Sequence, residues 1–321
     1  MELAKLNDII KTSKNILIAS HINPDGDTLG SMCGIYSLIE LNFKKKCEML
    51  VVSKIPKTYE FLPNIKFAKN IEMYDKSREY DLVICVDVAA LDRIADGQIL
   101  FNKSKFTVNI DHHKTNIGYA NLNYINSEAS SASEVIYEIA KKLDWKIDIN
   151  TAISLYTGIL TDTGSFRFNN TTAKSLRYIA ELIETGVSPC EMYKLCYENR
   201  PKNMILFQSY CVNKAKFTDD DKIAYTTVYK KDLEKFNAEE DFTDGLTERL
   251  RAISTTQIAF VAKEINNGWT KISMRSKIHD VAKICEVFNG GGHKLASGCT
   301  IKSSMEDAIN KIMNEIRKIP L

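Results

Sequence analysis

Short apolar runs alternate with stretches of helical periodicity through the first half of the chain. Continuous apolar runs, typical of buried parallel strands, lie at residues 16–20, 49–52, 82–86 and 106–110. A helical pattern of apolar positions follows the first run, from about Thr28 to Leu41. Strands separated by helices predict stacked β-α-β units, and therefore an α/β fold with a mostly parallel sheet flanked by helices.

The pattern changes in the second half. Residues 131–184 are predominantly helical in periodicity, and Gly186, Pro189 and Pro201 then punctuate a stretch that we interpret as a helical connector. Beyond it, residues 222–229 resemble a strand, and residues 258–265 and 269–274 predict a hairpin around Asn267-Gly268. A helix over 280–288 then leads into Gly290-Gly-Gly-His293.

These patterns predict two domains. We place a first domain at residues 1–186 and a helical linker at 187–205. A second, smaller α/β domain with a mixed sheet then occupies residues 206–321. A length of 321 residues suits two domains of ordinary size.

Composition and charge narrow the functional classes. Hydrophobic residues make up 44% and charged residues 26%, which excludes a disordered or fibrous protein. The net charge of +2 does not mark a binder of long nucleic acid or of an anionic membrane, so phosphate contacts must come from a local site. No apolar run of about eighteen residues predicts a membrane span, and the N-terminus lacks the apolar stretch of a secretory signal. The eight scattered cysteines fit buried, reduced thiols in a cytoplasmic protein.

Histidines and aspartates gather where predicted strands end. His21, Asp25 and Asp27 follow the first strand, Asp87 ends the third, and Asp111-His112-His113 end the fourth. Because the carboxyl ends of parallel strands line one crevice, we expect these side chains to converge.

The residue types point to a pair of divalent cations. Asp162, which ends a predicted apolar helix, adds a fourth carboxylate to Asp25, Asp27 and Asp87. Four converging carboxylates would repel one another without cations, and two ions about 3.5–4 Å apart are typical of in-line displacement at phosphorus. The competing interpretation is that a strand-end aspartate is a turn residue or a helix cap, and Asp27 could cap the helix after it. The conjunction of all these positions in order favours the metal site.

The same residues resemble the successive motifs of the DHH phosphoesterases. The resemblance rests on four segments of the first half, at residues 21–31, 86–87, 111–113 and 161–165. Residues 288–298, Phe-Asn-Gly-Gly-Gly-His-Lys-Leu-Ala-Ser-Gly, resemble the DHH-associated C-terminal domain, with Asn289 where relatives often carry glycine.

The resemblance implies a hydrolase with two manganese ions, for which magnesium or cobalt could substitute. By position in the motifs, His21, Asp25 and Asp87 would hold one ion, and Asp27, Asp87, His112 and Asp162 would hold the second. The catalytic residues would be Asp111, which orients an imidazole, and His113, which faces the substrate phosphate.

The second domain would bind substrate. The glycines Gly290, Gly291 and Gly292 can let backbone N–H groups approach an oxyanion, and His293 adds a donor. Arg275 offers a bidentate fork to a non-scissile phosphate. The alternatives are a flexible glycine turn and a solvated arginine. Arg167 is a weaker candidate to line the site near Asp162.

Within the family, the chain looks most like the branch that degrades short oligoribonucleotides to mononucleotides (nano-RNase activity) and converts 3′-phosphoadenosine 5′-phosphate to AMP. A cyclic-di-AMP or pApA phosphodiesterase is the near alternative. A single-strand exonuclease, which usually carries an added oligonucleotide-binding barrel, and a non-catalytic nucleotide-binding module are less favoured. The substrate preference, the direction of attack and the native metal stay open, and exposed apolar helices would suit a homodimer.

Overall fold

In the computed structural model, which describes residues 2–320, the chain forms two compact units. One unit ends at Asn199 and the other begins at Arg200. In the range predicted as a linker, α7 (Pro189–Tyr193) and the π-helical turn Lys194–Glu198 belong to the first unit, and α8 (Lys202–Asn213) begins the second.

The first unit is built on a six-stranded, fully parallel sheet with strand order β3-β2-β1-β4-β5-β6. The strands are β1 (Ile16–Ala19), β2 (Glu48–Val51), β3 (Ala68–Asn70), β4 (Leu82–Val86), β5 (Thr107–Asp111) and β6 (Leu122–Ile125). The predicted parallel sheet is confirmed. The two edge strands β3 and β6 escaped the prediction because neither is a buried apolar run: β3 has no fully buried residue, and β6 has one.

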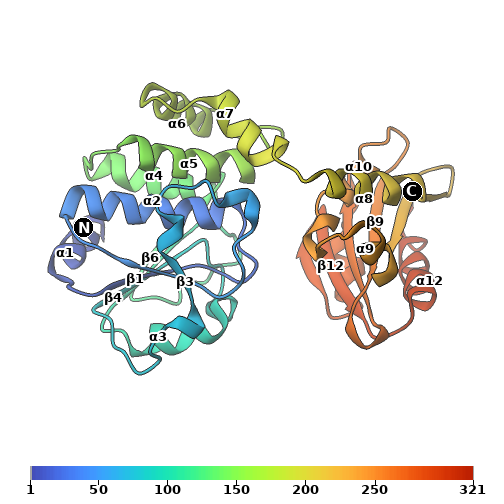
Figure 1. The fold of residues 1–321 in the computed structure, drawn as a ribbon, viewed down its shortest axis with the longest axis horizontal. Coiled ribbons are helices and arrows are strands. Elements are labelled where there is room, and N and C mark those ends of the chain that lie inside the picture. The colour runs from blue at the N-terminus through green and yellow to red at the C-terminus, as the bar shows by residue number, and fades with distance from the viewer. Residues whose placement is uncertain (1, 321) are drawn as a thin grey trace. The chain divides into compact units, whose positions relative to one another are not determined.

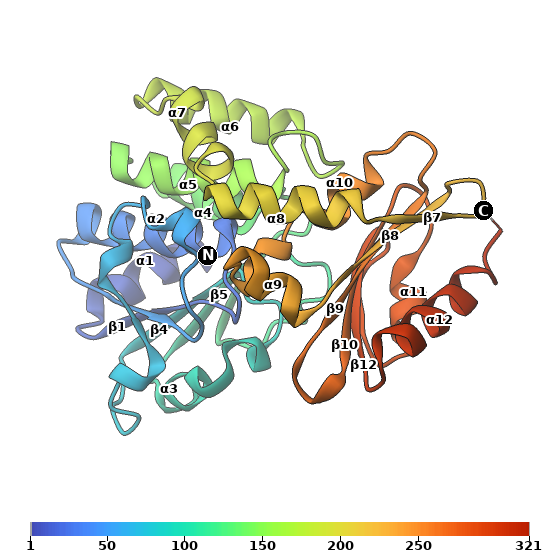
Figure 2. The same ribbon diagram turned by 45° about the vertical axis from the view of Figure 1, so that its right-hand side comes forward.

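Helices cover both faces of this sheet (Figures 1 and 2). One face packs against α1 (Glu2–Thr12), α2 (Gly26–Phe43), α4 (Ala132–Lys142) and α5 (Ile149–Asp162), which together bury the larger core. The other face packs against α3 (Gln98–Lys103) and the turn before it. Beyond α5 lie α6 (Ala173–Glu184) and α7, which add a further helical layer (Figure 1).

Helix α2 begins two residues earlier than its apolar periodicity predicts. Asp25 is its N-cap, since the Asp25 Oδ1 atom accepts hydrogen bonds from the backbone N–H groups of Asp27 (3.1 Å) and Thr28 (3.0 Å). The cap is therefore Asp25, and not Asp27 as the alternative interpretation of the sequence supposed.

The second unit is built on a mixed sheet with strand order β11-β12-β10-β9-β8-β7. Its strands are β7 (Lys216–Thr218), β8 (Ile223–Val228), β9 (Ile258–Glu264), β10 (Thr270–Ser276), β11 (Gly291–His293) and β12 (Ala296–Ile301). Among the described strands of this sheet, only β8 and β9 pair in parallel. The predicted hairpin joins β9 to β10, and both turn residues have positive φ (65° at Asn267 and 70° at Gly268), as the Asn-Gly pair favours.

Helices also cover both faces of this second sheet. One face packs against α8, α9 (Lys230–Phe236) and α10 (Leu246–Arg251), and the other against α11 (Val281–Glu286) and α12 (Met305–Ile316). The mixed α/β architecture predicted for this half is confirmed.

Seven of the eight cysteines are buried, and all eight are free thiols, but Cys190 at the start of α7 is exposed, contrary to the prediction. Across residues 2–320, every helix is too short or too polar to cross a membrane.

Candidate metal centre

The candidate site lies at the point where the strand order of the parallel sheet reverses, between β1 and β4. The chain runs outward from β1 through β2 to β3, and outward on the other side from β4 through β5 to β6. In such sheets the crevice beyond the carboxyl ends of the two central strands is a common ligand site. His21 lies just beyond β1, Asp87 directly follows β4, and Asp111 is the last residue of β5.

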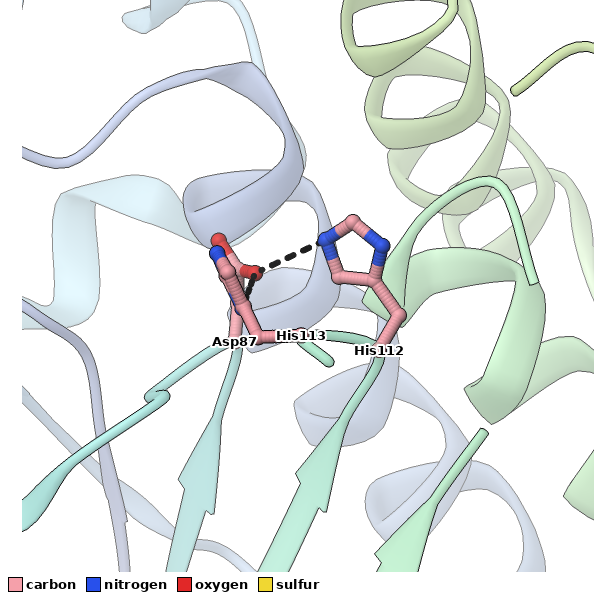
Figure 3. Close-up of side chains that lie close together, drawn as sticks. All are labelled: Asp87, His112 and His113. Atoms are coloured by element: carbon pink, nitrogen blue, oxygen red, sulfur yellow. Dashed lines mark ion pairs between the residues drawn. The ribbon is translucent and has the colours of Figure 1, made fainter. Parts of the chain in front are cut away.

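Asp87 lies at the middle of this cluster. Its backbone is left-handed (φ 58°), and its side chain is almost completely buried. The Oδ2 atom accepts a hydrogen bond from Thr28 Oγ1 (2.7 Å). Within residues 2–320, the buried Oδ1 atom makes no hydrogen bond; it lies 3.5 Å from His112 Nε2 and 3.7 Å from His113 Nδ1 (Figure 3). A buried carboxylate oxygen without a hydrogen bond is stabilised by a cation.

The predicted ligands form three overlapping groups whose donor atoms lie within 4.8 Å of one another. The first ligand group is His21, Asp25 and Asp87, and the second ligand group is Asp27, His112 and Asp162. A third group joins Asp87 and His112 to His113. The structure thus brings all six predicted ligands together, with Asp87 adjacent to both imidazoles that follow β5. It also places His113, which the resemblance assigns to substrate, within reach of the same position.

Charge is concentrated in the second ligand group. Burial raises the pKa of Asp27 to about 6, with the charge of Asp87 acting in the same direction. Burial and the nearby Asp27 likewise raise the pKa of Asp162 well above its usual range. Burial alone would lower the pKa of His112, but the carboxylates of Asp87, Asp27 and Asp162 outweigh burial and raise that pKa to about 10. The group therefore favours positive charge at its centre.

The pKa of Asp87 shifts in the opposite direction from the pKa values of Asp27 and Asp162. Burial would raise the pKa of its carboxyl group, but the imidazoles of His112 and His21 outweigh burial and hold that pKa below its usual range. Asp87 therefore stays ionised, as a carboxylate must be to hold a divalent cation. Oxygen and imidazole donors in this proportion suit manganese, magnesium or other first-row divalent ions.

Close packing of α2 against α5 holds the two ligand groups together. Gly30 on α2 and Gly158 on α5 lie at the contact. A Cβ atom on Gly30 would lie 2.5 Å from the Ser154 carbonyl oxygen, and one on Gly158 would lie 1.9 Å from Ser133 Oγ and 2.6 Å from Asp27 Oδ1. The absence of side chains at these positions lets the start of α2, which carries Asp27, approach the end of α5 at Asp162.

The start of α4 fixes the Asp27 carboxylate. The backbone N–H groups of Ala132 (2.7 Å) and Ser133 (3.0 Å) donate to Asp27 Oδ2 and Oδ1, respectively. Because these N–H groups belong to the first turn of α4, they have no carbonyl partner within the helix and suit an anion. Asp27 is thereby oriented before any cation binds.

A second network orients His113. The buried Asp111 carboxylate accepts a hydrogen bond from His113 Nδ1 (2.8 Å) and another from Asn116 Nδ2 (2.6 Å). Burial would raise the pKa of Asp111, but the neighbouring imidazole of His113 outweighs burial and lowers it. The imidazole that contacts Asp111 is therefore that of His113.

Two residues that the sequence pattern does not single out, Thr28 and Asn116, organise the centre. Thr28 Oγ1 contacts His21 Nε2 (2.7 Å), Asp25 Oδ1 (2.9 Å) and Asp87 Oδ2 (2.7 Å). Asn116 Nδ2 contacts Asp111 and also Asn109 Oδ1 (2.7 Å). The only sequence signal for Thr28 was a polar residue directly after Asp27 in the first turn of an apolar helix. Asn116 lies in a loop, where no periodicity marks it.

The substrate-binding candidates lie in the second unit. Arg275 on β10 donates from Nε to Glu248 Oε1 (2.8 Å) and from Nη1 to the Met274 carbonyl oxygen (3.0 Å). Residues Gly291–His293 form the edge strand β11, which pairs with β12, so they are not an open turn. The N–H group of Gly290 donates to the Cys285 carbonyl oxygen (2.9 Å). That N–H group is therefore not directed at a ligand, contrary to the expected oxyanion nest.

Comparison with known proteins agrees with this arrangement. The family model for the DHH family, N-terminal domain, matches residues 15–159, and that for the DHHA1 domain matches residues 220–319. The bifunctional oligoribonuclease and PAP phosphatase NrnA of Bacillus subtilis is 32% identical over 90% of this chain and 90% of its own length. The chain belongs to the DHH family. All six predicted metal ligands lie in the DHH domain or, for Asp162, three residues beyond its matched range.

Two further comparisons cover nearly the whole DHH-family chain. The probable bifunctional oligoribonuclease and PAP phosphatase NrnA of Streptococcus mutans is 31% identical over 93% of both chains. The crystal structure of an exopolyphosphatase-related protein from Bacteroides fragilis superposes with a TM-score of 0.93 and 25% identity, covering 99% of this chain and 96% of that one. The chain therefore shares its fold with the Bacteroides fragilis protein over nearly the whole length of both.

Proposed function

We propose that this DHH-family chain is a two-metal phosphoesterase that hydrolyses short oligoribonucleotides to mononucleotides and converts 3′-phosphoadenosine 5′-phosphate to AMP. The observation that carries the proposal is the position of Asp87 in the first ligand group and beside His112 of the second. The names of the relatives from Bacillus subtilis and Streptococcus mutans support this choice of substrates.

Manganese is the proposed metal, with magnesium or cobalt as substitutes. The first ligand group would hold one ion, and the second ligand group together with Asp87 would hold the other. When bound, two divalent cations supply Lewis acidity toward a phosphoryl group and toward an attacking water molecule. The fit rests on the buried Asp87 Oδ1 atom and on the oxygen and imidazole donors around it.

His113 is proposed to bind the scissile phosphate. Its Nδ1 atom is held by Asp111, so Nε2 is the nitrogen that can meet a substrate oxygen. Burial would lower the pKa of His113, but the carboxylates of Asp111 and Asp87 outweigh burial and raise it. A protonated imidazole donates a charge-assisted hydrogen bond to a phosphate oxygen, which stabilises negative charge developing there.

In the second unit, Arg275, Gly291, Gly292 and His293 are proposed to bind a non-scissile phosphate. Glu248 already accepts from Arg275 Nε, so it holds the guanidinium in place and leaves Nη2 for a phosphate oxygen. A net charge of only +2 suits substrates a few nucleotides long, since a long polymer favours an extended basic track.

A substrate panel with manganese tests the proposal. The panel contains pApA, a short RNA oligomer, 3′-phosphoadenosine 5′-phosphate, cyclic di-AMP and pyrophosphate. We expect release of nucleotide from the first two and of AMP from the third. Fastest turnover of cyclic di-AMP would instead favour the cyclic-dinucleotide alternative.

The Asp87→Ala variant tests the role of the shared ligand. We expect it to lower kcat on pApA about a thousandfold or more, because a metal-ligating carboxylate is lost. Asp8→Ala, which removes an exposed aspartate from α1, is the matched control and should retain wild-type turnover. Equal rates for Asp87→Ala and wild type would discard the proposed centre.

A further inference from the structure

The segment that follows Asp162 has an unusual backbone. Gly164, Ser165 and Phe166 all lie in the left-handed region, with φ of 56°, 61° and 64°. Such a conformation is unfavourable for serine and phenylalanine, and it persists only where surrounding contacts enforce it. Here the Ser165 N–H group donates to the Leu160 carbonyl oxygen (2.8 Å), and the Phe166 N–H group donates to Thr163 Oγ1 (3.2 Å).

This backbone positions the ring of Phe168. A Cβ atom on Gly164 would lie 2.4 Å from Phe168 Cζ and 2.5 Å from Cε2, so the ring packs directly on the glycine. The Phe168 N–H group donates to the Thr163 carbonyl oxygen (3.0 Å), which fixes the base of the side chain. Phe168 nevertheless remains 45% exposed. The fold therefore holds a large aromatic ring in a defined place with much of its surface in solvent.

The ring lies on a segment that starts and ends at the metal centre. Asn170 Nδ2 donates to the Asp162 carbonyl oxygen (3.1 Å), lies 3.5 Å from Asp162 Oδ2, and donates to the Ser130 carbonyl oxygen (2.9 Å). The Oδ2 atom of Asp162 lies 3.6 Å from the Nε2 atom of His112. The Nε atom of the exposed Arg167 donates to the carbonyl oxygen of Gly164 (2.7 Å), the glycine on which the ring packs.

We propose that Phe168 stacks on a nucleobase of the substrate and so contributes to substrate binding at the metal centre. This inference rests on the proposed function and adds a base-binding residue to it. An exposed ring and a guanidinium that both contact Gly164, on a segment next to the proposed phosphate-binding centre, match a nucleotide, which offers a flat base and an anionic backbone together. Arg167 and Asn170 make the surroundings too polar for a purely apolar ligand. Stacking does not depend on base identity, which suits short oligonucleotides of any sequence.

Steady-state kinetics on pApA provide the first test. We expect Phe168→Ala to raise KM about tenfold or more while kcat changes less than about threefold, since a base–aromatic stack contributes that much to binding. Phe168→Tyr keeps an aromatic face and should restore a KM close to wild type. Phe217→Ala, which removes a phenylalanine of similar exposure (43%) from β7, is the matched control. An unchanged KM in Phe168→Ala would overturn the proposal.

A binding measurement separates this inference from the proposed reaction. A pApA analogue with one adenine replaced by 2-aminopurine is titrated with Asp87→Asn, which is expected to turn over too slowly to consume the analogue, and with the double variant Asp87→Asn/Phe168→Ala. Stacking on Phe168 predicts quenching of the fluorescence in the first protein and its loss in the second. Equal quenching in both proteins, or none in either, contradicts the role of Phe168. Failure of the wild-type protein to hydrolyse any substrate of the panel would count against the proposed function alone.

Discussion

The Oδ1 atom of Asp87 lies 3.5 Å from the Nε2 atom of His112, although the two residues follow different strands. Strands β4 and β5 are parallel neighbours in which Val86 pairs with Ile110, so the residues just beyond each strand meet at one edge of the sheet. Sheet register thus brings an ionised carboxylate to two imidazoles, and α2 and α5 bring three more carboxylates to the same place.

The Thr28 hydroxyl is predicted to orient the shared ligand. Thr28→Val keeps the shape of the side chain but removes the hydrogen bond to Asp87 Oδ2. We expect kcat/KM on pApA to fall about 10- to 100-fold, as is usual when a partner of a metal ligand is lost. Thr28→Ser retains the hydroxyl and should keep most of the activity. Activity that is unchanged in Thr28→Val would show that Asp87 is held by other contacts.

Gly158 is predicted to be essential for the approach of α5 to α2. On helix propensity alone, Gly158→Ala would stabilise the protein by about 1 kcal/mol. The added Cβ atom would lie 1.9 Å from Ser133 Oγ and 2.6 Å from Asp27 Oδ1, and overpacking of this kind costs about 1–3 kcal/mol. We expect overpacking to dominate, with a lower free energy of unfolding in urea and weaker manganese binding.

Gly34→Ala provides the control for this substitution. Gly34 faces the same helix, but the nearest atom to its added Cβ is the flexible end of the Leu155 side chain (2.5 Å). Gly34→Ala should therefore leave manganese affinity close to wild type. A Gly158→Ala protein as stable as wild type would show that α2 and α5 can move apart without loss of stability.

Asp232 is predicted to make the second unit less stable at acid pH. Burial would raise the pKa of this carboxyl group, but bonds from Lys214 and from the Tyr229 N–H group (3.0 Å) outweigh burial and lower it. A carboxyl group with a pKa lower in the folded than in the unfolded state stabilises the fold above the unfolded value, about 4. That stabilisation is lost as the pH falls through the lower, folded value.

Asp232→Asn should therefore reduce the free energy of unfolding at pH 7 and flatten its decline below about pH 4. Urea denaturation at a series of pH values measures both effects. Lys214→Met removes the partner cation and should likewise flatten the decline in the free energy of unfolding at acid pH. If the free energy of unfolding declines equally at acid pH in wild type and Asp232→Asn, the pH dependence belongs to other carboxylates.

The sequence predicted where the candidate ligands of the first unit come together, because His21, Asp87 and His112 lie just after buried apolar strands and Asp162 ends an apolar helix. Asp25 and Asp27 instead lie at the start of the apolar helix α2. Asp87 could be placed beside His112 from strand order alone, since parallel neighbours end at one edge. The network through Thr28 and Asn116 could not be predicted, because it depends on side-chain directions in a loop and a first helical turn. Edge strands such as β3 also gave no signal, as their burial is incomplete.

In the second unit, the structure contradicts the expected anion nest at Gly290, whose N–H group donates to the Cys285 carbonyl oxygen. Gly291 pairs with Gly298 in the edge strand β11, and phosphate binding by Gly291 and Gly292 stays a proposal. Glycines permit tight sheet pairing as readily as an anion nest, and the sequence does not distinguish the two. The homodimer suggested by exposed apolar helices stays a prediction.

Removal of divalent ions is predicted to lower both activity and stability. An apo protein prepared with a chelator must keep several carboxylates close together without cations, so we expect no turnover and a lower Tm. Ions present at about 100 times their Kd stabilise the folded state by about 2.7 kcal/mol. Addition of manganese should restore both properties, and a Tm that does not respond to the chelator or to manganese would argue against resident ions.

The most direct measurement is anomalous diffraction at the manganese absorption edge from crystals grown with manganese. We predict two peaks in each chain, one beside His21 and Asp25 and one beside Asp27, His112 and Asp162, with Asp87 contacting both. A single peak, peaks that do not contact Asp87, or no peak at this cluster would contradict this prediction.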